Sequence, residues 1–319
     1  MRRRSFVFAL SLMAALAAPA PGFAAQPSGE LRSEWKEVFS QDGTISRVFL
    51  KHRVPHEPNA AIQAWSVTQL VNNGPSSSKF DLVFVGDGYT SSQLGTYNSH
   101  VTSKLNQIMA MQPFAGHQSQ FNVWRVNVIS TQSGVDNDPT FGVTKNTALD
   151  MYFWCGGLDR LLCVNETKAL QAAANAPDAD QVIAIANSTT YGGAGGTVAT
   201  ASGGHASSGQ IAIHELGHSI GGLADEYDYA DGSCYPYSEP TEPNVSRLTS
   251  AQMQAAGTKW ASYLGQPTPD GGTIGTYQGA RYYSNCIYRP SSNSIMRTLG
   301  QQFNSVSRDV MISKFYTEP

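Results

Sequence analysis

The chain has 319 residues, of which 41% are hydrophobic and 14% are charged. This composition supports a packed globular core, in one large domain or two small ones. The formal net charge of -3 gives no basis for binding an anionic polymer or surface, so we expect neither nucleic acid nor a membrane as partner.

The N-terminal stretch has the layout of a secretory signal peptide. Three arginines precede a short apolar run from Phe6 to Ala18, and prolines and small residues follow. The run is too short to span a membrane comfortably. We therefore expect a signal peptide at residues 1–24, cleavage after Ala24, and a secreted or periplasmic protein with no membrane attachment after cleavage.

Residues 25–78 are expected to form a short N-terminal lead-in. Two alternating segments within it, 46–52 and 63–71, are interpreted as strands or extended chain. The stretch NNGPSSSKF, residues 72–80, is rich in turn residues and marks the start of the main domain. That domain is expected to cover residues 79–319.

The main domain alternates between strand and helix patterns. The continuous apolar run from Leu82 to Val85 fits a strand that is covered on both faces of a sheet. Further strands are predicted at 121–130 and 181–188, and helices at 91–111, 166–174, 208–220 and 303–316. This order predicts an α/β sandwich with a mostly parallel sheet.

The four cysteines are expected to form two disulfides, because the protein is predicted to be exported. Three connectivities are possible. We favour Cys155–Cys163, which closes a short local loop, and Cys234–Cys286, which ties together two segments downstream of residue 218.

The stretch HELGHSIGGLADEYDY, residues 214–229, holds the strongest chemical signal. His214 and His218 lie four residues apart on a predicted helix, so both imidazoles can reach one zinc ion. Glu215 is rotated away from that pair and can take a proton from a water on the open side of the ion. The alternative is an amphipathic helix with two surface histidines. The apolar flanks, the two glycines at 221–222 and the acids that follow favour the metal site.

A third ligand is expected shortly after the helix. Metzincin peptidases have the pattern HExxHxxGxxH or HExxHxxGxxD, and Gly221 matches its glycine, but the position of the third ligand is occupied by Ala224. A turn longer by one residue would allow Asp225 to bind, and we favour it over Glu226. The other acid would support the site from outside the coordination sphere. Met296 lies in a stretch that is similar to the metzincin Met-turn and would pack beneath the histidines.

Several motifs together resemble the M64 family of zinc metallopeptidases, known as IgA peptidase M64. They are DLVFVGDGYT, FNVWRVNVISTQSGVDNDPT, YGGAGG, HELGHSIGGLADEYD, CIYRPSSNSIMR and FNSVSRDVM, and they run in order from about residue 80 to the end. The resemblance implies an α/β, metzincin-like zincin catalytic domain with a twisted mixed sheet, an active-site helix and a C-terminal helix. It also implies one catalytic Zn²⁺ at His214 and His218, catalysis by Glu215 and a structural role for Met296.

The sequence leading to the zinc helix supplies further candidates. The stretch GGAGGTVAT lies where a metzincin has an edge strand that pairs with extended substrate, although a mobile surface loop is an alternative. Tyr227, Tyr283 and Tyr288 are candidates to donate a hydrogen bond to the oxyanion.

The leading functional hypothesis is a monomeric secreted zinc endopeptidase that acts on protein or peptide substrates. The alternatives are a zinc amidase that acts on cell-wall peptides or small amides, and a non-catalytic binding module on a peptidase fold. The intact Glu215 argues against the last of these.

Overall fold

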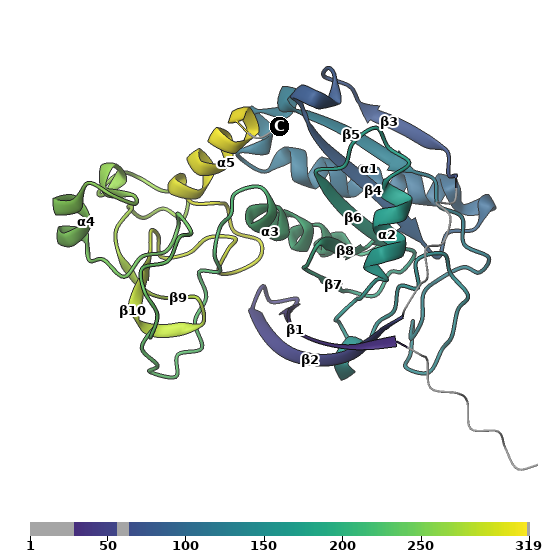
Figure 1. Cartoon of the computed structure of the whole chain (residues 1–319), viewed down its shortest axis with the longest axis horizontal. Helices are drawn as coiled ribbons and strands as arrows, with labels where there is room; N and C mark the ends of the chain where they lie inside the picture. The colour runs from purple at the N-terminus through teal and green to yellow at the C-terminus, as the bar shows by residue number, and fades with distance from the viewer. Residues whose placement is uncertain (1–28, 56–63, 318–319) are drawn as a thin grey trace, which may run out of the picture.

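The computed structural model describes residues 29–55 and 64–317, so the predicted signal peptide lies outside the described residues. At its centre is a six-stranded sheet in the order β3-β5-β4-β6-β8-β7 (Figure 1). The inner strands β5 (Phe121–Val126), β4 (Phe80–Asp87), β6 (Gln181–Ala186) and β8 (Val198–Ser202) are parallel. The edge strands β3 (Val67–Val71) and β7 (Gly193–Ala194) are antiparallel to their neighbours. The sheet is therefore mixed, with a parallel centre.

Helices cover both faces of the sheet. One face packs against α1 (Leu94–Ala110), α3 (Gly209–Ser219) and α5 (Ser305–Thr317), and the other against α2 (Glu166–Ala173). Strand β4 explains why both faces need cover. Its side chains alternate, so Leu82 and Phe84 join the first core cluster while Val83 and Val85 join the second. The apolar run from Leu82 to Val85 thus forms the strand buried on both sides that the sequence predicted.

The predicted strand 121–130 ends earlier than expected, at Val126. Beyond it the backbone leaves the sheet, and the Ser130 N–H donates to the Tyr89 carbonyl at 2.8 Å. The Ser130 hydroxyl also donates to the buried carboxylate of Asp87 at 3.0 Å. Residues after Val126, which the alternating pattern assigned to this strand, instead form hydrogen bonds at the Asp87 end of β4.

A smaller lobe precedes α5 and lies beside the sheet-bearing body. It contains α4 (Ser250–Ala256) and a hairpin of β9 (Tyr277–Ala280) and β10 (Tyr283–Arg289). Its core includes Met253, Trp260 and Ile274, which pack with Val306 of α5. The two disulfides of the structure are Cys155–Cys163 and Cys234–Cys286, the pairs that the sequence favoured, and the second one closes this lobe.

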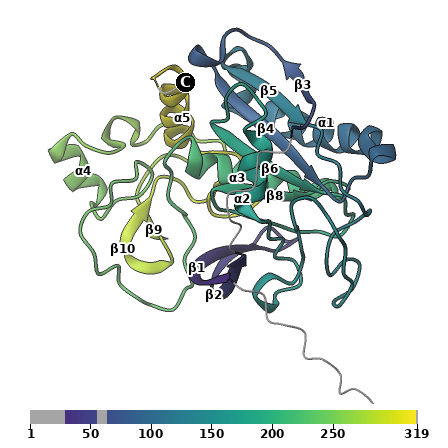
Figure 2. The same cartoon turned by 45° about the vertical axis from the view of Figure 1, so that its right-hand side comes forward.

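The N-terminal segment forms an antiparallel hairpin of β1 (Gly29–Phe39) and β2 (Ile45–Pro55). It is separate from the main sheet and lies between the β9–β10 lobe and the body (Figures 1 and 2). Val38 and Leu50 pack with the Cys155–Cys163 disulfide, and Phe39 and Ile45 join the first core cluster. The segment expected to be a lead-in is therefore a ribbon packed into the domain.

Within residues 29–55 and 64–317, no helix combines the length and the apolar character needed to cross a membrane.

Candidate metal centre

Helix α3 brings two histidines together on one face. His214 is fully buried, and the side chain of His218 is 27% exposed. Their Nε2 atoms lie 3.0 Å apart. Two imidazoles bound to one tetrahedral zinc at about 2.0–2.1 Å would have their nitrogens about 3.3 Å apart. The helical spacing therefore sets the pair close to the distance that a shared ion requires.

Backbone carbonyls orient both rings. The Nδ1 atom of His214 lies 3.0 Å from the carbonyl oxygen of Ile295, and Nδ1 of His218 lies 2.6 Å from that of Leu223. A carbonyl can only accept, so each Nδ1 carries the proton and donates it, which leaves each Nε2 free to bind a cation. The tautomer that ligation needs is thus fixed by two loops that flank the helix.

Met296 packs against α3 next to the residue that orients His214. A Cβ added to Gly217 would lie 2.6 Å from the Met296 sulfur, so only glycine allows this close approach. Met296 is fully buried, and its carbonyl accepts from the Glu226 N–H at 2.8 Å. The methionine therefore lies against the histidine helix and also fixes the loop that follows it.

Asp225 returns to the two histidines after the helix ends. Gly222 has a φ of +57°, a left-handed conformation that reverses the chain. Asp225 Oδ1 then lies 3.5 Å from Nε2 of His214 and 3.3 Å from Nε2 of His218. This buried oxygen accepts no hydrogen bond. Such an oxygen is costly unless a cation compensates it, so the donor set fits a metal ion.

Glu226 points away from this centre. Its carboxylate accepts hydrogen bonds from Asn244 at 2.9 Å, Ser294 at 2.7 Å and Asn304 at 2.9 Å. Burial raises the pKa of Glu226, and these donors counteract that rise. Of the two acids weighed from the sequence, the structure brings Asp225 to the histidines and uses Glu226 to hold the loop from behind.

A second acid reaches the histidines, from the N-terminal hairpin. Glu37 on β1 has Oε2 3.1 Å from Nε2 of His214 and 3.6 Å from Nε2 of His218. One ligand atom from each of Glu37, His214, His218 and Asp225 lies within 4.8 Å of the others. Sequence reasoning missed Glu37, which lies 177 residues before His214 in a segment without any metal-binding spacing.

The electrostatics of the cluster favour a positive charge at its centre. Burial alone would lower the pKa of His214, but the charge of Glu37, the nearby carboxylate of Asp225 and a hydrogen bond to Glu37 raise it to about 10. The pKa of His218 is also raised, chiefly by Asp225 against the effect of burial. A cation bound between the rings would satisfy the same two carboxylates.

Glu215 lies outside this group of four. Its carboxylate is buried against the backbone of Gly195, where an added Cβ would come within 2.1 Å of Oε1. That oxygen accepts no hydrogen bond. Burial, and then the charge of Glu37, raises the pKa of Glu215 to about 7. This residue is therefore poised to take or give a proton near neutral pH.

Two tyrosines contact the cluster. Tyr227 donates to Oε1 of Glu37 at 2.7 Å, and Tyr282 donates to Oδ2 of Asp225 at 2.5 Å. Tyr283 instead packs on Tyr235 and Tyr237 in the smaller lobe, and the backbone of Tyr288 pairs with Ser246. Of the three predicted oxyanion donors only Tyr227 lies at the site, and Tyr282 was missed.

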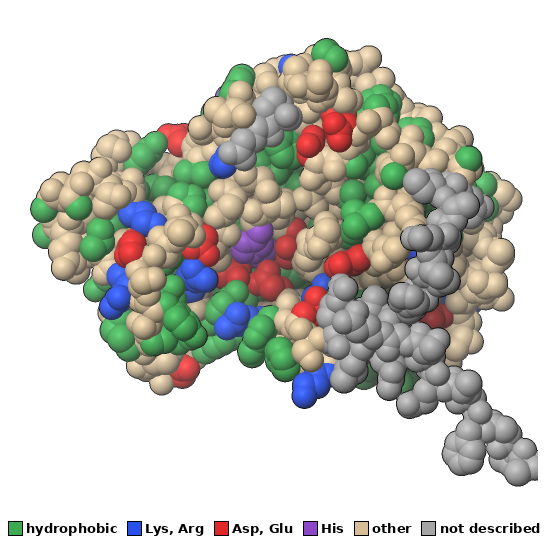
Figure 3. Space-filling view, in the orientation of Figure 1, with side chains coloured by type: hydrophobic (Ala, Val, Ile, Leu, Met, Phe, Trp, Pro, Cys, Tyr) green, Lys and Arg blue, Asp and Glu red, His purple; other side chains and the backbone are tan. Residues whose placement is uncertain are grey.

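The glycine-rich stretch forms the edge of the sheet next to this cluster. Strand β7 is the outermost strand on that side and leads into Gly195, which contacts Glu215. Figure 3 shows histidine surrounded by acidic side chains near the middle of the face that carries the site. The outer side of β7 bridges Leu161, so the glycine-rich stretch lies beside the four potential ligands without leaving an open strand edge there.

Comparison with known families gives one match. The model of the family described as IgA Peptidase M64 matches residues 68–271 and 267–315. The match begins in β3, ends in α5, and includes α3 and Asp225 but not the β1–β2 hairpin. Comparison with individual curated proteins gave no match.

Proposed function

The chain belongs to the IgA peptidase M64 family, and on this premise we propose that it is a secreted zinc endopeptidase that hydrolyses peptide bonds. The observation that carries the proposal is the convergence of His214, His218 and Asp225. Two Nε2 atoms and one carboxylate oxygen that accepts no hydrogen bond meet beside a buried acid. Two histidines and a carboxylate are a ligand set typical of catalytic zinc.

We infer that His214, His218 and Asp225 hold one zinc ion and that Glu215 acts as the general base and acid. An ion held by these residues would supply an acidified water and polarise the scissile carbonyl. Glu215 accepts a proton from the attacking water on its carboxylate and returns it to the leaving amine nitrogen. Its raised pKa supports both halves of this transfer, because neither protonation state is strongly favoured near neutral pH.

The family match supports a protein or peptide as substrate. Gly195 follows β7 and lies against Glu215, so the glycine-rich segment borders the proposed general base. A match to a peptidase family favours the endopeptidase over the amidase. We infer that the Tyr227 hydroxyl, which contacts Glu37 beside the histidines, donates a hydrogen bond to the developing oxyanion when substrate is bound.

Export is supported by the N-terminal sequence and by the two disulfides, which form in oxidising compartments. We expect the protein to be secreted or periplasmic and to act as a monomer.

The test is incubation of the purified protein with a peptide library, with and without a chelator and added zinc. Both the intact chain and a chain that has been cut between β2 and β3 and freed of the hairpin should be assayed, because the hairpin lies over the site. Cleavage of peptides that stops on chelation and returns with zinc supports the proposal. No cleavage by either form, with zinc bound at one ion per chain, contradicts it.

A further inference from the structure

We propose that Glu37 is a fourth ligand of the same ion and that the β1–β2 hairpin is an inhibitory segment that must leave before peptide can bind. This inference rests on the proposed function. Catalytic zinc needs three protein ligands and one open position, whereas four protein ligands close the sphere. With Glu37 in place, two imidazoles and two carboxylates would hold the ion, and four protein ligands would complete the set that is typical of a closed zinc site.

Glu37 has the geometry of a ligand rather than of a passing surface acid. Its side chain is only 14% exposed, and Oε2 faces both Nε2 atoms. The other oxygen, Oε1, is held by the Tyr227 hydroxyl at 2.7 Å. The carboxylate is therefore oriented in the same way as Asp225, with one oxygen bonded to a tyrosine and the other directed at the histidines.

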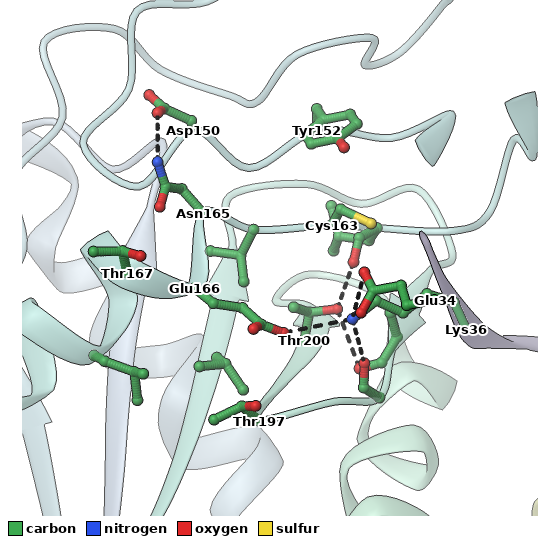
Figure 4. A pocket seen from close by; sticks show the side chains of 16 residues that line it. Glu34, Lys36, Asp150, Tyr152, Cys163, Asn165, Glu166, Thr167, Thr197 and Thr200 are labelled. Atoms are coloured by element: carbon green, nitrogen blue, oxygen red, sulfur yellow. Dashed lines mark hydrogen bonds and ion pairs between the residues drawn. The ribbon is translucent and has the colours of Figure 1, made fainter. Parts of the chain in front are cut away.

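Strand β1 also lies along the glycine-rich segment that borders Glu215. It packs against β7, and the Lys36 ammonium donates to the Gly195 carbonyl at 3.3 Å. Side chains alternate along a strand, so Lys36 and Glu37 face opposite ways. Lys36 extends into a cavity of about 400 Å³ and meets Glu166 at 3.4 Å, as Figure 4 shows. The hairpin thus covers the glycine-rich segment through Lys36 and reaches the potential metal ligands through Glu37.

The second strand of the hairpin contacts the opposite wall. The Arg47 guanidinium lies 3.3 Å from the centre of the Tyr282 ring, and the Arg47 N–H donates to the Tyr229 hydroxyl at 3.0 Å. The turn is held as well, because the Leu299 N–H donates to the Gly43 carbonyl at 2.9 Å. An extended substrate could not reach the histidines while these contacts persist.

Nothing covalent would hold the hairpin after a cut behind β2. All four cysteines lie at or beyond residue 155, and both disulfides are within the remainder of the chain. The family match also begins at residue 68, after the hairpin. A single cleavage between β2 and β3 would therefore convert a tethered segment into one held only by packing, hydrogen bonds and the ion.

The experiment measures whether bound zinc slows release of the hairpin and whether the hairpin increases the affinity for zinc. A recognition sequence for a specific protease is inserted between Pro55 and Ala64, and the folded chain is cut with and without bound zinc. Release of the hairpin is followed by size-exclusion chromatography and mass spectrometry. Coupling between two ligands is reciprocal, so zinc should slow hairpin release by at least about tenfold, and the hairpin should tighten zinc binding.

Glu37→Ala should remove the effect of zinc on hairpin release and weaken zinc binding in the uncut chain, measured by competition with a chelator. Glu37→Gln keeps the size of the side chain and should behave the same way, which separates loss of the ligand from loss of packing. Glu34→Ala is the matched control. It removes a carboxylate from the same strand, but Glu34 faces Lys36 at 3.5 Å and is not in the metal-binding group.

Equal release with and without zinc, or an equal zinc effect in the parent and in Glu37→Ala, would overturn the proposal. Zinc-dependent release that disappears in both Glu37 variants supports it. If the freed protein then binds zinc through three ligands and cleaves no peptide, the ligand assignment stands and the peptidase proposal fails.

Discussion

Tyr282 donates a hydrogen bond to Asp225 over 2.5 Å, and so fixes which carboxylate oxygen faces the two histidines. The two residues are 57 positions apart in the sequence and belong to different parts of the molecule, the loop after α3 and the smaller lobe. A partner that orients a metal ligand typically contributes about 10–100-fold to metal affinity.

Tyr282→Phe should therefore weaken zinc binding by about 10–100-fold without removing a ligand. The substitution keeps the ring beneath Arg47, so the hairpin contact is preserved. Tyr283→Phe is the neighbouring control, since that ring packs on Tyr235 and Tyr237, away from the site. Dissociation constants from chelator competition decide the matter, and equal values for both variants would contradict the role of Tyr282.

Glu215→Gln should abolish peptidase activity while the zinc content stays at that of the parent. Glu215 is not in the group of four potential ligands, so its loss should not open the coordination sphere. Removal of a general acid–base is worth about 10²–10⁴-fold in rate. Both readouts come from the hairpin-free forms: activity on a peptide that the parent cleaves, and metal analysis of the same sample. Near-normal turnover by the variant would rule out the proposed mechanism.

Asp225→Ala and Glu226→Ala should fail in different ways. The first removes a proposed ligand and should lower zinc affinity directly, with a smaller effect on the metal-free fold. The second removes the acceptor of three buried hydrogen-bond donors, on Asn244, Ser294 and Asn304. Each donor left without a partner should lower the free energy of unfolding by about 1–3 kcal/mol. Zinc titration and denaturant unfolding separate the two effects. If Glu226→Ala empties the site while Asp225→Ala does not, the ligand assignment is wrong.

The two disulfides should contribute unequally to the free energy of unfolding. Cys234–Cys286 spans 52 residues and Cys155–Cys163 spans 8. Loop-closure entropy assigns about 4 kcal/mol to the longer loop and about 2.5 kcal/mol to the shorter. Paired serine substitutions, one disulfide at a time, followed by denaturant titration in the metal-free state, measure the difference. A larger loss from the Cys155–Cys163 pair would show that native packing outweighs loop length.

Much of the sheet-bearing body could be predicted because its signals are local. The apolar run in β4, the periodicity of α1 and the spacing of His214 and His218 each lie within one element. The position of Asp225 near the histidines also depends on a local feature, the turn after α3, while its role as a ligand remains a proposal. Each of these features can be recognised from neighbouring residues alone.

The remaining features depend on contacts between distant segments. Glu37 lies in a polar stretch whose only distinction is where β1 packs, and Tyr282 reaches Asp225 from another lobe. The smaller lobe itself has few regular elements and relies on a disulfide and scattered apolar residues for its core. Periodicity carries no information about such pairings, so neither residue could be found from spacing.

Asn244 gives the loop around Asp225 an unusual dependence on the smaller lobe. Its side chain accepts from the Ala224 N–H at 2.8 Å, donates to the Ala224 carbonyl at 2.8 Å, and also bonds Glu226. The loop that carries Asp225 is thereby hydrogen-bonded to the smaller lobe, which Cys234–Cys286 closes. The histidines instead belong to a helix that packs on the sheet. An ion bound by Asp225 and by the histidines would link the smaller lobe to the sheet-bearing body. The two parts should therefore unfold in one thermal transition when the ion is bound and in separate transitions when the ion is removed.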